Sequence, residues 1–173
     1  MGARHVAHVF VPARFVCITL HLFGLFALIT TDGKKNSIEV TIYPFRHDVN
    51  NELYNAKVQS ATLEMDTALV WGILFCIFEL ISMTIGSISI ESPLLSCVSV
   101  AIHFIAAILL FFTIFDGWSY LTFTNYIFWY TSFVPFVLEV LLDIMSYRDT
   151  YLYIGKKIVE LVRNSPCCKG KKL

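Results

Sequence analysis

The chain has 173 residues, of which 57% are hydrophobic and 15% are charged, and its formal net charge is zero. A soluble domain of this size carries about 25% charged residues. The composition therefore excludes an ordinary soluble globular protein and favours one membrane domain with little chain left for a second.

Four apolar stretches are each long enough to cross a bilayer as one α-helix. A hydrocarbon layer of about 30 Å needs about 20 apolar residues in a helix. The stretches run over residues 11–29, 67–86, 94–115 and 119–142. The sequence predicts an all-α bundle of four transmembrane helices in residues 1–146 and a basic, amphipathic tail in residues 147–173. The connections after the second and third stretches are short, so spans two to four should be antiparallel neighbours.

The connection between the first two spans is a polar loop of 35 residues, from residue 32 to residue 66. Inside it, Ile38, Val40 and Ile42 alternate with more polar residues, and Pro44 follows. Alternation with a period of two predicts a short strand over residues 37–43.

The distribution of basic residues predicts the orientation. The two tails carry nine Lys and Arg residues, and the loop at 32–66 carries four. The positive-inside rule places both termini in the cytosol and the loop on the outer or lumenal side.

The tail after Ser146 has an apolar and a basic helical face, which is typical of a short helix lying on the membrane surface. A frayed soluble tail is the alternative, because so short a helix is marginal without a surface to bind. Cys167 and Cys168 lie beside lysines. They are candidate palmitoylation sites, and two unmodified cytosolic thiols are the alternative.

Each span contains one histidine or one glutamate: His21, Glu79, His103 or Glu139. An acidic residue at mid-membrane costs about 2.5–3.5 kcal/mol, so each of these side chains should face a partner rather than lipid. At 1.5 Å per residue, the first three lie about 12–15 Å from the cytosolic boundary. We interpret them as structural contacts in which Glu79 hydrogen-bonds to His21 or His103. A proton relay is the alternative.

A second polar group is expected at the cytosolic rim of the bundle. Arg14 begins the first span at the level where Glu139 and Asp143 end the fourth. We predict an ion pair between Arg14 and one of the two acidic residues, because partial hydration at this depth lowers the cost of burial.

No motif in the chain indicates catalysis. The histidines are scattered at positions 5, 8, 21, 47 and 103, and no metalloprotease, phosphate-loop or nucleophile signature is present. We therefore predict no enzyme, no catalytic residue, no metal, no cofactor, no small-molecule substrate and no nucleic-acid partner. The lipid bilayer and other membrane or scaffold proteins are the expected partners.

Several ordered segments resemble the transmembrane protein 107 family of four-pass proteins. Val11-Pro12-Ala13-Arg14-Phe15 and His21-Leu22 resemble the family's V-P-S-R-F and A-H-L. The other matching segments are Phe78-Glu79-Leu80, Ser99 to His103, Phe111 to Trp118, and Pro135 with Glu139. In this sequence Asp116-Gly117 replaces the family's acidic-basic pair, and the basic tail is longer.

The resemblance implies a non-catalytic membrane component of the ciliary transition zone, at the base of the cilium. Such proteins help to recruit and anchor Meckel–Gruber-type module proteins, which support cilium assembly and control the composition of the ciliary membrane. The alternative function is that of a small proton-coupled transporter or channel subunit that uses the intramembrane His and Glu residues.

Overall fold

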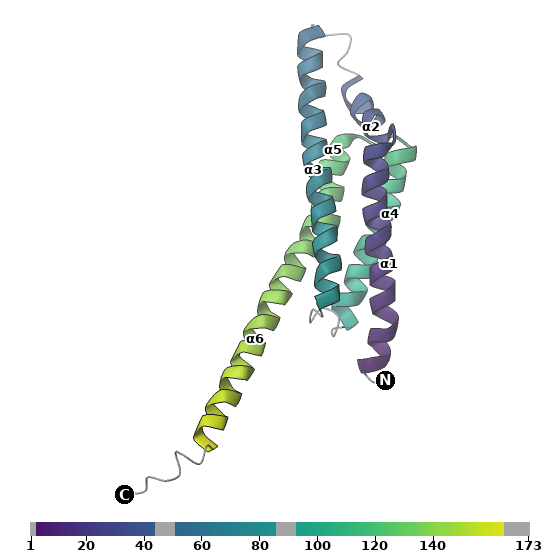
Figure 1. Ribbon diagram of the computed structural model, residues 1–173. Coiled ribbons are helices and arrows are strands. Elements are labelled where there is room, and N and C mark those ends of the chain that lie inside the picture. The colour runs from purple at the N-terminus through teal and green to yellow at the C-terminus, as the bar shows by residue number, and fades with distance from the viewer. Residues whose placement is uncertain (1–2, 44–50, 86–92, 165–173) are drawn as a thin grey trace, which may run out of the picture.

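The structure is a computed structural model, and it describes residues 3–43, 51–85 and 93–164 (Figure 1). All elements in these ranges are helical: α1 (Ala3–Thr30), α2 (Gly33–Ile42), α3 (Asn51–Ile85), α4 (Pro93–Phe115), α5 (Tyr120–Thr122), the π-helical η3 (Phe123–Ile127) and η4 (Trp129–Phe133), and α6 (Val134–Asn164). Four segments are long and apolar enough to cross a membrane: Val9–Thr30, Glu52–Thr84, Leu94–Phe115 and Tyr120–Met145. The predicted all-α fold with four transmembrane helices is confirmed.

The helices form a bundle in which α1 contacts α4 most extensively and α3 next. The N-terminal end of α1 and the C-terminal end of α6 lie toward the same end of the molecule, and α2 lies toward the other (Figure 1). At one α1–α4 contact, a Cβ added to Gly24 would lie 3.0 Å from Leu110 Cδ1. Glycine therefore leaves room for the Leu110 side chain against α1.

The bundle has a narrow apolar core and broad apolar outer faces. Ile18, Leu25, Met65, Leu69 and Leu110 are fully buried between the helices. Only 28–39% of the most apolar window of each span is buried inside the protein. The remaining side chains, Phe23 and Phe111 among them, point outward. A lipid-facing surface explains such exposure, because hydrocarbon chains solvate apolar side chains as well as a protein core does.

The predicted strand over residues 37–43 is wrong, because this segment is helical in α2. Ile38 and Ile42 are one helical turn apart and are both buried, whereas Val40 is 56% exposed. The Ser37 hydroxyl also donates a hydrogen bond to the Gly33 carbonyl at 2.9 Å. Packing of one helical face against the bundle thus outweighs the short alternating pattern.

Two polar contacts hold α2 across the end of the bundle. Lys34 Nζ lies 2.8 Å from Asp66 Oδ1 on α3. The Thr41 and Ser119 hydroxyl oxygens are 2.7 Å apart, which joins α2 to the turn that follows α4. The described part of the 32–66 connection is thus largely helical, because it contains α2 and the first turns of α3.

A pair of substitutions distinguishes the helix from the strand. A strand would place Val40 and Ile42 on the same face. In α2, Ile42 is buried and Val40 is exposed. We expect Val40→Ala to change the free energy of unfolding by less than about 0.5 kcal/mol. Ile42→Val removes a smaller group but should cost about 0.5–1.5 kcal/mol. Reversible unfolding in mixed micelles measures both, and a larger loss for Val40→Ala would contradict the helix.

The fourth span differs from a regular helix in two ways. Gly117 turns the chain before it with a φ of 64°, which favours glycine. The span then passes through the π-helical segments η3 and η4. There an N–H donates to the carbonyl five residues before it instead of four, as the Val134 N–H does to the Trp129 carbonyl. Pro135 follows directly and has no N–H to donate.

The tail helix is not a separate element. The sequence placed a short surface helix after Ser146, but α6 continues from the membrane span to Asn164 without a break. No glycine or proline occurs between Pro135 and Gly155, so nothing in the local sequence stops the helix there. Figure 1 shows α6 as one rod that diverges from α1, α3 and α4.

Candidate functional site

The histidine or glutamate of each predicted span lies inside the bundle. His21, Glu79 and His103 are fully buried, and Glu139 is 3% exposed. They come from α1, α3, α4 and α6 respectively. Two connected groups result: a ladder of hydrogen bonds in the middle of the bundle, and an ion-pair group beside the N-terminal part of α1.

The ladder consists of Glu79, His103 and His21. His103 Nε2 lies 2.8 Å from Glu79 Oε2, and its Nδ1 lies 2.9 Å from His21 Nδ1. His103 is therefore the central residue, because each of its two ring nitrogens contacts a different partner. If its Nε2–H donates to Glu79, a neutral His103 ring must accept a hydrogen bond from His21 at Nδ1. The protonation of each member of the ladder thus depends on that of its neighbours.

Cys76 joins the ladder at its His21 end. Its Sγ lies 3.6 Å from His21 Nδ1, and the side chain is fully buried. No role for Cys76 was predicted from the sequence. The spacing to Glu79 could have shown it, because residues three apart share one face of a helix.

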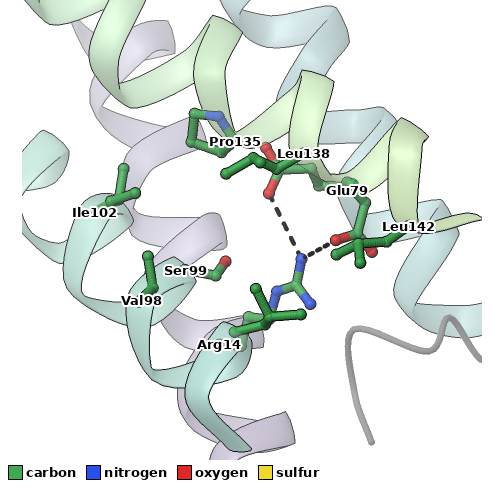
Figure 2. Close-up of a pocket in the computed structure, with 10 residues that line it drawn as sticks. Arg14, Glu79, Val98, Ser99, Ile102, Pro135, Leu138 and Leu142 are labelled. Carbon is green, nitrogen blue, oxygen red and sulfur yellow. Dashed lines mark hydrogen bonds and ion pairs between the residues drawn. The ribbon is translucent and has the colours of Figure 1, made fainter. Parts of the chain in front are cut away.

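The ion-pair group is centred on Arg14, which is 3% exposed. Its Nη2 lies 2.7 Å from Glu139 Oε2 and 3.9 Å from Glu79 Oε2. Dashed lines in Figure 2 mark these two contacts of Arg14. The structure thus brings together Arg14 and Glu139, the residues for which the sequence predicted a pair, and also connects this group to the ladder through Glu79.

Asp143 enters the same group through a serine. Ser82 Oγ lies 2.9 Å from Glu139 Oε1 and 2.8 Å from Asp143 Oδ2. A hydroxyl has one hydrogen to donate, so it can serve only one carboxylate. The second contact is a hydrogen bond only when that carboxyl group is protonated. Ser82 therefore links α3 to two successive turns of α6.

A small cavity of about 30 Å³ adjoins Arg14 and is lined by Ser99, Pro135 and Glu139, among others (Figure 2). That volume is enough for one or two water molecules. Glu79 Oε1 and Ser99 Oγ are buried here and make no hydrogen bond. Polar atoms in a cavity of this size can bind water, and such water would hydrate the ion pair.

The remaining candidate residues, Cys167 and Cys168, lie outside the residues that the structure describes. The modification predicted for them therefore stays a prediction.

Helices long enough to span a bilayer, lipid-compatible outer faces and a buried polar network define a multi-pass membrane protein. The family model named TMEM107, described as a transmembrane protein, matches residues 10–142. The chain therefore belongs to the transmembrane protein 107 family, and the resemblance noted in the sequence is confirmed. Searches among curated proteins and among solved structures give no match.

Proposed function

We propose that this protein is a non-catalytic membrane component of the ciliary transition zone, where it helps to recruit and anchor Meckel–Gruber-type module proteins. The family match over residues 10–142 carries the proposal, because it includes most of each of the four transmembrane helices. The contacts of the ladder and of the ion-pair group support a structural role, since each of them joins two helices of the bundle. Such hydrogen bonds average about 0.6 kcal/mol in membranes and so specify an arrangement more than they stabilise it.

Localisation tests this proposal directly. In a ciliated cell, the tagged protein should concentrate between the basal body and the axoneme, and proximity labelling should recover transition-zone membrane and scaffold proteins. A chain ending at residue 146 would show whether the α6 extension carries those contacts. An even distribution over the plasma membrane, with normal cilia after the gene is deleted, would refute the role.

The proposed topology places both termini in the cytosol. The nine basic residues of the tails against four in the 32–66 connection support it. In sealed vesicles with the cytosolic face outward, we expect added protease to remove a C-terminal tag and to leave a tag inserted at residues 44–50 intact. Permeabilised vesicles provide the control. Cleavage of the inserted tag alone would reverse the assignment.

One observation favours a second function, that of a small proton-coupled transporter or channel subunit. The ladder from Glu79 through His103 to His21 joins three titratable groups by contacts of 2.8 and 2.9 Å. A proton added at His21 can move along the ladder to Glu79 by successive transfers. Proton flux into proteoliposomes, compared between the wild type and His103→Gln, tests this function. Equal flux in both and in empty vesicles would exclude it.

A further inference from the structure

The two histidines and the cysteine at the centre of the bundle have the composition of a metal site. The donor atoms of His21, Cys76 and His103 all lie within 4.8 Å of one another, and the three side chains are fully buried. They come from α1, α3 and α4, so no short sequence motif contains them. From this geometry we propose that His21, Cys76 and His103 bind one thiophilic d¹⁰ cation, Zn²⁺ or Cu⁺. This site goes beyond the proposed function.

Two of the three donor–donor distances are close to those around a tetrahedral ion. His21 Nδ1 and Cys76 Sγ are 3.6 Å apart. Tetrahedral Zn²⁺ with Zn–N of about 2.0 Å and Zn–S of about 2.3 Å separates these two donors by about 3.5 Å. The two Nδ1 atoms are 2.9 Å apart, against about 3.3 Å for two nitrogens on one zinc ion. The third pair, His103 and Cys76, lies within 4.8 Å, so these two side chains move together by up to about 1.3 Å when the ion binds.

The contacts around the site also suit a metal. Glu79 Oε2 holds His103 Nε2 at 2.8 Å, which leaves Nδ1 facing His21. A carboxylate on the far nitrogen of a ligating histidine is the usual second contact in zinc sites, where it fixes the tautomer. Without a metal, the 2.9 Å contact between the two Nδ1 atoms is an N–H···N hydrogen bond, and a bound ion would take the place of that hydrogen.

The charges balance in the membrane interior. A Cys76 thiolate and an ionised Glu79 together cancel the two charges of Zn²⁺, and the thiolate alone cancels Cu⁺. Arg14 and Glu139, 2.7 Å apart, cancel each other beside them. A neutral cluster avoids the cost of an isolated charge in hydrocarbon.

The two ions differ in the number of ligands that they take. Zinc usually has a fourth ligand, such as water. Thiolate ligands suit both Cu⁺ and Zn²⁺.

Metal content of the full-length protein in detergent tests the site. After incubation with Zn²⁺, or with Cu⁺ under a reductant, and removal of the excess, mass spectrometry should find about one ion per chain. Cys76→Ser and His103→Gln should each lose it. Cys97→Ser is the matched control, because Cys97 lies on α4 but is exposed, and it should retain the ion. Glu79→Gln should weaken the affinity by about 10–100-fold.

A second experiment uses absorption spectroscopy of the wild-type protein. Its result does not depend on how the variants fold. Co²⁺ added to the wild type should give a thiolate-to-metal charge-transfer band that added Zn²⁺ removes. Retention of the ion by Cys76→Ser, or a wild type that binds neither ion and gives no thiolate band, overturns the proposal. Binding of only one of the two ions identifies which of them the site holds.

Discussion

Replacement of Arg14 by leucine is expected to lower the free energy of unfolding by about 3–5 kcal/mol, because it leaves a buried carboxylate without its cation. Arg14 Nη2 lies 2.7 Å from Glu139 Oε2, and both side chains are 3% exposed. Glu79 Oε2, at 3.9 Å, loses the same positive neighbour. Reversible unfolding of the purified protein in mixed micelles measures the loss.

Two further variants separate the buried charge from the loss of packing. In Arg14→Leu/Glu139→Leu both members of the pair are apolar, so we expect most of the lost stability to return. Lys34→Met removes an ion pair of similar length, 2.8 Å, but its members are 25% and 45% exposed. It should therefore cost less than about 1 kcal/mol. If Arg14→Leu and Lys34→Met lowered the free energy of unfolding equally, burial of the Arg14–Glu139 pair would not increase its contribution to stability.

Glu79→Leu should destabilise the protein by about 1–3 kcal/mol, whereas Glu79→Gln should be tolerated. Leucine removes the acceptor 2.8 Å from His103 Nε2 and leaves a buried N–H unpaired. Glutamine keeps an oxygen that can accept this hydrogen bond. The comparison is made with a chelator present, so that metal binding does not contribute. Similar losses in both variants would mean that the carboxylate charge itself is required, which would favour proton transfer.

The sequence predicted the spans and their polar residues because both signals are local. A stretch such as residues 94–115 needs only its own apolar side chains to be identified as a membrane helix. His21, Glu79, His103 and Glu139 are conspicuous in such stretches because a charge there is costly. The depth estimate also placed His21, Glu79 and His103 near one level, where the structure joins them.

Features that depend on packing between helices could not be predicted in the same way. Which of three residues at one depth lies in the middle depends on how α1, α3 and α4 are rotated about their axes. The sequence therefore left open whether Glu79 contacts His21 or His103. Cys76 was missed because a cysteine in an apolar helix usually serves as a small apolar residue. The strand over residues 37–43 failed because its alternation also places Ile38 and Ile42 on one helical face.

The continuous helix α6 has two different environments along its length. Up to Met145 it belongs to a membrane span, whereas the described side chains from Tyr147 to Ile158 are exposed. An isolated helix of this length is only marginally stable in water. Amide hydrogens beyond Met145 should therefore exchange with solvent much faster than those before it. Any surface that covers the extension would slow this exchange, so exchange rates along α6 report directly whether the extension is bound.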